Sequence, residues 1–272
     1  MDTLERVGAE AIADLERYLW RHYQENIALL HDLRQGARGR REAPLLLGYR
    51  LGGAIVAVQA IYRAGRWLPH FERADVVPAM LADARDHWLR WLLGPRRVVD
   101  AILARLPALG LRVTFDEIDA FCYVDGRCFV PHPAPGVRRA TRRDLEDVAT
   151  LRAAFEAEYF GVPLERIERA WCLRAAEGYI RDGAYVAHRD GRAVAMVAVE
   201  AALPQLTHIG AVYTVGAYRN RGLAKGAVPP AALHRASPAE IRVETAKIYS
   251  AASRRNSAPP SVGCGERATA SF

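Results

Sequence analysis

The sequence predicts an α+β protein built from two domains. Amphipathic segments with helical spacing alternate with short apolar runs that end at glycine turns, a pattern typical of helices packed on a sheet. A proline-rich segment at 131–136 (PHPAPG) divides the 272-residue chain into two parts of similar length. Since a chain of this length holds one large domain or two modest ones, the linker favours two. We expect a first domain over 1–130 and the core of a second over 137–228.

The first part predicts four helices and a few strands. Its opening 30 residues repeat apolar side chains at helical spacing, and Pro95 suits the first turn of a helix. Asp125-Gly126 is a strong hairpin signal. The expected elements are helices at 4–34 (broken near 20–25), 77–93 and 95–106, strands at 44–49 and 54–62, and a hairpin of 115–123 with 127–131.

The second part begins with a short strand at 137–141. Thr141 then caps a helix that runs to about Phe155, since Thr is a favoured N-cap residue. The elements expected next are a helix at 164–174, strands at 184–189 and 193–200 joined at Asp190-Gly191, and a long strand that ends at Val215.

A loop rich in arginine and glycine follows this long strand and opens a helix. It spans Tyr218 to Ala224 (YRNRGLA). Backbone amides at a helix N-terminus point outward and carry partial positive charge, which suits a phosphate or diphosphate. Gly222 lets the backbone come close to an anion, while Arg219 and Arg221 add charge-assisted donors. The segment therefore predicts an anion site.

The Arg219-x-x-Gly222-x-Ala224 pattern, placed directly after a strand, resembles the acetyl-CoA loop of the GNAT acyltransferases. The resemblance covers 137 to about 227. It implies the GNAT fold, a mixed and mostly antiparallel sheet flanked by helices. It also implies an acetyl-CoA-dependent N-acetyltransferase that transfers an acyl group to a primary amine by direct attack in a ternary complex.

The order of elements in the first part resembles a divergent copy of the same domain, as in tandem GNAT proteins. Residues 71–76 lack the Arg-x-x-Gly-x-Gly/Ala pattern, so we expect this half not to bind CoA. An unrelated accessory α/β domain is the alternative. In both cases the first domain would shape the acceptor site or form a homodimer contact.

The GNAT resemblance assigns cofactor contacts to the long strand and the loop. It implies that acetyl-CoA lies in a splay between neighbouring strands, with its pantetheine arm along the strand before the loop and its diphosphate on the loop amides. The cofactor-binding residues implied are Tyr213, Thr214, Val215, Arg219, Arg221, Gly222, Leu223, Ala224, Lys225 and Gly226.

Catalytic candidates follow from the need to deprotonate an amine, whose pKa in water is ~10.4. Glu200 ends the strand that precedes the central one, and Tyr213 lies on the central strand. The resemblance places Glu156 and Glu158 where family members have substrate-contacting helix residues. Each has a structural alternative, a solvated carboxylate for the glutamates and a packed strand residue for Tyr213.

The resemblance ends after Gly226. Pro229-Pro230 interrupts the helix with which the family continues, and all six serines lie at 237 or beyond. Tyr249 precedes Asn256, whereas the family order puts a tyrosine after it. This change of composition marks 229–272 as a separate segment. It is either a divergent, disordered tail or the product of a shifted reading frame, and it leaves open a catalytically impaired CoA-binding or interaction protein.

Composition and motifs restrict the binding partners and the cellular location that we expect. The formal net charge of +7 invites nucleic-acid binding, but basic and acidic residues are interleaved, as at 142–147, which is typical of a solvated face. Apolar stretches of ~18 residues, a signal-peptide pattern and metal-ligand spacing are absent from the sequence. We expect a cytoplasmic enzyme without a metal, whose partners are an acyl-CoA and an unidentified amine. Nucleic-acid binding through the arginines of 34–41 is a third interpretation.

Overall fold

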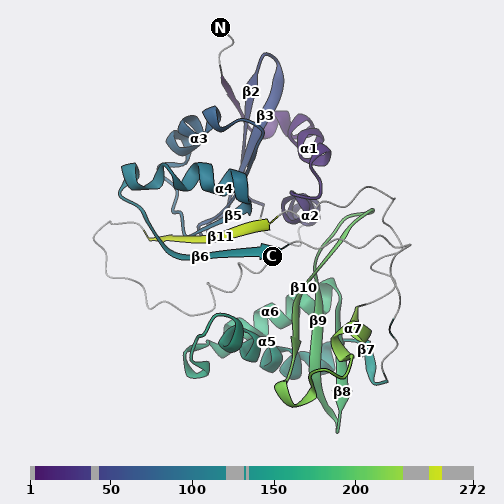
Figure 1. The fold of residues 1–272 in the computed structure, drawn as a ribbon. Helices are drawn as coiled ribbons and strands as arrows, with labels where there is room; N and C mark the ends of the chain where they lie inside the picture. The colour runs from purple at the N-terminus through teal and green to yellow at the C-terminus, as the bar shows by residue number, and fades with distance from the viewer. Residues whose placement is uncertain (1–3, 38–42, 121–131, 133–134, 229–244, 253–272) are drawn as a thin grey trace. The chain divides into compact units, whose positions relative to one another are not determined.

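The structure, a computed structural model, describes residues 4–37, 43–120, 132, 135–228 and 245–252 (Figure 1). The chain divides into two compact units. The first comprises residues up to 123 together with 242–257, and the second centres on 124–241. The domain boundaries predicted from the sequence stay predictions, because the linker at 131–136 lies mostly outside the described residues.

A mixed sheet forms the first unit. Its described strands follow the order β1-β2-β3-β4-β5-β11-β6, and every neighbouring pair is antiparallel except β4 with β5. The strands are β1 (Glu5–Val7), β2 (Leu45–Leu51), β3 (Ala54–Ile61), β4 (Arg66–Phe71), β5 (Trp91–Pro95), β6 (Arg112–Ala120) and β11 (Thr245–Ala252).

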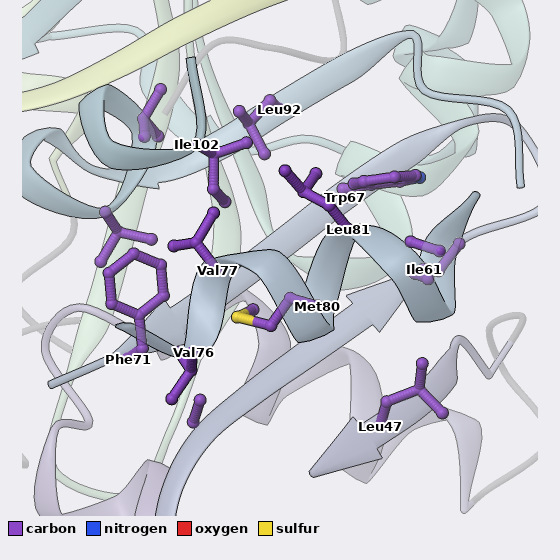
Figure 2. Packing of buried hydrophobic residues seen from close by; sticks show 14 of the residues in the cluster. Leu47, Ile61, Trp67, Phe71, Val76, Val77, Met80, Leu81, Leu92 and Ile102 are labelled. Atoms are coloured by element: carbon purple, nitrogen blue, oxygen red, sulfur yellow. The ribbon is translucent and has the colours of Figure 1, made fainter. Parts of the chain in front are cut away.

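Helices cover this sheet and enclose an apolar core. Met80 and Ile102 come from two helices and lie in one buried cluster with Trp67 and Leu92 of the sheet (Figure 2). Full burial of each such side chain contributes about 1.5–3 kcal/mol to folding. The helices are α1 (Ile12–Arg21), α2 (Ile27–Gly36), α3 (Val77–Ala84) and α4 (Arg96–Leu103).

Two sequence-based expectations for this unit are wrong, and one strand was not predicted. The helix expected at 77–93 ends at Ala84, and Trp91–Pro95 is strand β5 instead. Strand β4 was not expected, because Pro69 and His70 interrupt its apolar pattern. Glu5–Val7 is a strand rather than the start of a helix, since it pairs with β2. The break near 20–25 and the helix after Pro95 are confirmed, and the turn at 125–126 lies outside the described residues.

Part of the atypical tail forms regular structure. Strand β11 lies between β5 and β6 and is antiparallel to both, with Ile248 opposite Leu93 on one side and Glu117 on the other (Figure 1). Tyr249 is therefore in a strand of the first unit. A segment distant in sequence completes this sheet.

The second unit contains an antiparallel sheet in the order β10-β9-β8-β7. The expected strands and their turn are confirmed, and Asp190 and Gly191 both have positive φ, as a tight hairpin turn requires. The elements are β7 (Val137–Arg139), α5 (Leu145–Tyr159), α6 (Arg169–Asp182), β8 (Ala184–Arg189), β9 (Arg192–Ala202), β10 (Thr207–Thr214) and α7 (Leu223–Ala227).

Helices lie on both faces of this second sheet. Val186 packs in the cluster under α5 and α6, while its neighbour Ala187 packs with Leu223 of α7. Successive strand residues point to opposite faces, so α7 lies across the sheet from α5 and α6 (Figure 1). The helix expected at 164–174 starts later and is longer, because only a 3-10 turn forms at Leu164–Arg166.

The start of α5 depends on Asp144. Its Oδ2 accepts hydrogen bonds from the backbone N–H of Thr141 at 2.7 Å and from Thr141 Oγ1 at 3.0 Å. Arg138 donates to both carboxylate oxygens, at 2.8 and 2.7 Å. The Arg138 guanidinium, reinforced by the Thr141 bonds, holds the pKa of this buried carboxyl well below its usual range.

Asp144→Asn will lower the free energy of unfolding at pH 7 by about 1–3 kcal/mol, because a charge-assisted cap is lost. The lowered pKa stabilises the fold above the unfolded-state value of about 4, and this contribution is lost as the pH falls below it. Urea unfolding at pH 7 and pH 3 should therefore show a difference between wild type and variant that shrinks in acid. An unchanged difference would contradict the assignment, and Arg143→Gln, in the adjoining turn, is the control.

Candidate functional site

A pocket of about 610 Å³ lies in the second unit where β10 ends. Three parts of the chain line it, namely the last turns of α5, the end of β10 and the segment that leads into α7. The lining residues are Phe155, Glu158, Tyr159, Val212, Tyr213, Thr214, Tyr218, Arg219, Asn220, Gly222, Leu223, Ala224 and Lys225.

The segment after β10 is tightly turned. The N–H of Tyr218 donates to the carbonyl of Val215 at 2.8 Å, and Asn220 and Gly222 have φ of 60° and 74°. Gly222 then caps α7, whose first N–H groups have no partner within the helix. The predicted loop-to-helix transition is confirmed, although α7 is short and ends at Ala227.

An ion pair crosses the pocket. Arg219 Nη2 lies 2.6 Å from Glu158 Oε2, and Arg219 Nε donates to the carbonyl of Thr214 at 2.9 Å. The hydroxyl of Tyr213 donates to the same Glu158 oxygen at 3.3 Å. The hydrogen bond from Arg219 holds the pKa of Glu158 below its usual value, and burial together with Glu158 raises the pKa of Tyr213. Helix, strand and loop are thus joined at one carboxylate.

Aromatic rings form one wall of the pocket. Phe155 stacks on Tyr159 with ring centroids 5.2 Å apart, and Tyr213 meets Phe155 edge-on at 6.5 Å. Such offset and edge-to-face arrangements are favourable beyond the area they bury. Phe155 and Tyr159 escaped the sequence analysis as site residues. Their i, i+4 spacing on a helix that already carried a candidate Glu158 is the signal that could have identified them.

A β-bulge in β10 lies beside the pocket. Gly210 pairs with Ala198 and Tyr213 pairs with Met196, so Ala211 and Val212 share one partner position on β9. Ala211 has a φ of 45°, and the side chain of Val212 is exposed at the pocket. Bulges re-aim side chains and interrupt the hydrogen-bond ladder, and they are common beside active sites. Gly210 inside an apolar strand pattern was the available sequence signal.

A buried polar cluster underlies the aromatic wall. Arg152 is 1% exposed, forms an ion pair with Glu156 and donates to the hydroxyl of Tyr179 at 2.7 Å. Its guanidinium carbon lies 5.0 Å from the ring centroids of Phe155 and Trp171. Burial raises the pKa of Glu156 to about 7 against the pull of Arg152. Glu156 therefore has a structural partner in the interior and does not line the pocket.

Glu200 lies away from the pocket lining. Its Oε2 is 3.8 Å from Nδ1 of His208, and its carboxyl group covers Gly210, where any side chain would clash with it. Burial lowers the pKa of His208 to about 4, so this imidazole is neutral at neutral pH. The structure brings Glu158 and Tyr213 together but leaves Glu200 apart from them.

Comparison with solved structures identifies the fold of this chain. No family model and no curated protein matches the sequence. A solved tandem GNAT protein from the clavulanic acid biosynthesis pathway, without acetyl-CoA, matches 94% of this chain and 100% of its own at 15% identity, with a TM-score of 0.50. The chain has the GNAT fold. The fold class predicted from the sequence is confirmed, and the similarity runs through both units.

Other solved proteins with the GNAT fold are similar over nearly the whole chain. A GCN5-related N-acetyltransferase from Sphaerobacter thermophilus is 14% identical, with 95% of this chain and 98% of that chain covered and a TM-score of 0.47. An acetyltransferase of the GNAT family from Colwellia psychrerythraea is 10% identical, with 92% and 99% covered and a TM-score of 0.43.

Within this GNAT fold, most predicted cofactor contacts meet at one pocket. Those that line it are Tyr213, Thr214, Arg219, Gly222, Leu223, Ala224 and Lys225, whereas Val215, Arg221 and Gly226 do not. The N–H of Val215 already donates to Val194, at 2.9 Å. In the part of the chain that the structure describes, no helix is both long and apolar enough to cross a bilayer.

Gly222→Ala will distort the loop, because a Cβ there would lie 2.6 Å from Nε2 of His132 and the φ of 74° disfavours other residues. We expect unfolding free energy to fall by about 1–2 kcal/mol and amides at 219–226 to exchange faster with solvent. Gly191→Ala is the matched control, since its φ is 77° but its surroundings are open. Equal effects would show that the His132 contact is unimportant.

Arg152→Met will cost about 1–3 kcal/mol of unfolding free energy, because the buried Glu156 and Tyr179 lose their charged partner and Glu156, whose pKa is already about 7, must then be protonated to stay in the interior. The double variant Arg152→Met/Glu156→Leu should recover much of that loss, since no buried charge remains. Denaturant unfolding of the wild type, both single variants and the double variant measures the coupling. Additive effects of the two substitutions would contradict a buried ion pair.

Proposed function

We propose that the protein is an acyl-CoA-dependent N-acyltransferase that uses acetyl-CoA and acetylates a primary amine. One observation carries the proposal, namely that the Arg/Gly loop follows β10 directly and lines a pocket in a chain with the GNAT fold. A tandem GNAT protein among the similar structures supports the same class of reaction. A cytoplasmic location and a divergent first domain at 1–130 belong to this proposal.

The donors around the loop fit a diphosphate. Arg219 and Lys225 line the pocket, and the first N–H groups of α7 are not used inside the helix. These groups would hold the diphosphate, with Arg221 adding charge at the rim. The pantetheine arm would lie along Tyr213 and Thr214. Val215 is less suited, because its N–H and its carbonyl are both hydrogen-bonded within the protein.

Bound acetyl-CoA supplies the thioester, and the side chains of the pocket orient the reaction. In one ternary complex, the neutral amine of the acceptor attacks the thioester carbonyl. The C–N bond forms, the C–S bond breaks, the thiolate leaves and the nitrogen gives up one proton to water. Tyr213 is protonated at neutral pH, since the ordinary tyrosine pKa of about 10 is raised further here, and its hydroxyl is the proposed donor to the thiolate. Glu200 stays a sequence-based candidate for the base and would act only through water.

A second candidate function is a CoA-binding protein with impaired catalysis. Among the described residues β10 is an edge strand with β9 as its neighbour, whereas β4 of the first unit has the parallel neighbour β5. The GNAT resemblance places acetyl-CoA between two such strands. An open edge at β10 would leave that cleft with one wall.

Arg219→Ala should raise KM for acetyl-CoA about 10- to 100-fold, as expected for loss of a hydrogen bond to a charged group. Thiol release from acetyl-CoA with a panel of amines measures turnover, and calorimetry measures CoA binding. Arg166→Ala removes an exposed arginine outside the pocket and is the control. Binding without turnover would select the second candidate, and absence of binding would contradict both.

A further inference from the structure

The pocket contains one carboxylate beside an aromatic wall, and this combination restricts the acceptor. We propose that the acceptor is a monoamine with an aromatic or branched apolar body and no carboxylate, whose ammonium group binds Glu158. This rests on the proposed function and names the substrate class of the same site.

Charge is the first part of the argument. Among the described residues that line the pocket, Glu158 is the single acidic one, and the lining cations are Arg219 of the loop and Lys225 of α7. One carboxylate balances one ammonium, so a polyamine would bring further positive charges without partners. An amino acid would need a cation for its own carboxylate, and both Arg219 and Lys225 are taken by the diphosphate in the proposed complex.

Surface chemistry is the second part. Tyr159 is 42% exposed and Val212 is 45% exposed, and both line the pocket with Phe155 and Tyr213. These side chains present apolar area and ring faces around the carboxylate. An apolar body would cover this area, and its ammonium group would be attracted both to Glu158 and to the aromatic faces.

The ion pair of Glu158 with Arg219 is the third part, because it must open before an ammonium can bind. Both side chains are about half exposed, so their attraction is weak and readily exchanged. A diphosphate carries more charge than a carboxylate and offers an arginine several acceptor oxygens. When Arg219 turns to it, Glu158 keeps the hydroxyl of Tyr213 and becomes available to the amine.

This exchange makes the two substrates interdependent. CoA should increase the affinity for the amine, and the amine should increase the affinity for CoA by the same factor. Glu158 acts here as the ammonium-binding group. In the free protein Arg219 holds the pKa of Glu158 below its usual value, so this carboxylate is ionised when the ammonium arrives. The overall reaction converts an ammonium and acetyl-CoA into an amide, free CoA thiol and one proton released to solvent.

The test compares three acceptors that differ in one respect at a time. 2-Phenylethylamine has one ammonium and a ring, phenylalanine adds a carboxylate to that body, and spermidine replaces the body with further amines. We expect kcat/KM for thiol release to be at least tenfold higher with 2-phenylethylamine than with either of the others. Equal or faster turnover of phenylalanine or spermidine would overturn the proposal.

Glu158→Gln supplies the second readout. It should raise KM for 2-phenylethylamine at least tenfold and leave KM for acetyl-CoA unchanged or lower, because Arg219 is released. Glu177→Gln removes an exposed carboxylate of α6 outside the pocket and is the matched control. Calorimetric titration of CoA into both variants separates the two proposals. If CoA binds and turnover occurs but the amine KM is unchanged, this inference fails alone, whereas loss of CoA binding in the wild type defeats both.

Discussion

The aromatic wall of the candidate site depends on the buried guanidinium of Arg152. A guanidinium stays protonated at any physiological pH, so Arg152 must be compensated where it lies. Its contacts with Glu156, Tyr179 and the rings of Phe155 and Trp171 fix the end of α5 against α6. The same turns of α5 carry Phe155 and Glu158 to the pocket. Interior electrostatics therefore determines the position of a surface carboxylate.

The two units differ in the two features that the GNAT resemblance associates with acetyl-CoA binding. In the first unit β4 has its parallel neighbour β5, but the segment after β4 is acidic and Asp75 already binds Arg73, with Nη2 and Oδ2 2.5 Å apart. In the second unit Arg219 and Lys225, which follow β10, line a pocket. The described sheet of this unit ends at β10. The cations that suit a diphosphate are thus in the second unit, whereas the pair of parallel strands is in the first.

Local signals predicted the loop, the Asp190-Gly191 hairpin and the cap at Thr141, because each depends on neighbours in sequence. Long-range packing decided what was mispredicted. In the sequence, the apolar run Trp91–Pro95 is compatible with a helix as well as with a strand. It is a strand in the structure because it pairs with β4 on one side and β11 on the other. Arg152 resembles a solvated helix residue in the sequence, yet α6 buries it. The pocket was predictable from its loop, whereas its aromatic wall required the tertiary contacts of α5.

Strand β11 has a consequence for the order of folding. The chain leaves the first unit near 120, forms the second unit and then returns, so the second unit is an insertion within the first. Strand β5 ends at residue 95 and β6 at residue 120, whereas β11 begins only at residue 245, so both strands gain this neighbour long after they have been synthesised. Contacts of such sequence separation form slowly, and unpaired strand edges invite association with other chains. During translation the inserted unit can fold first, whereas the sheet of the first unit stays incomplete until β11 has been synthesised.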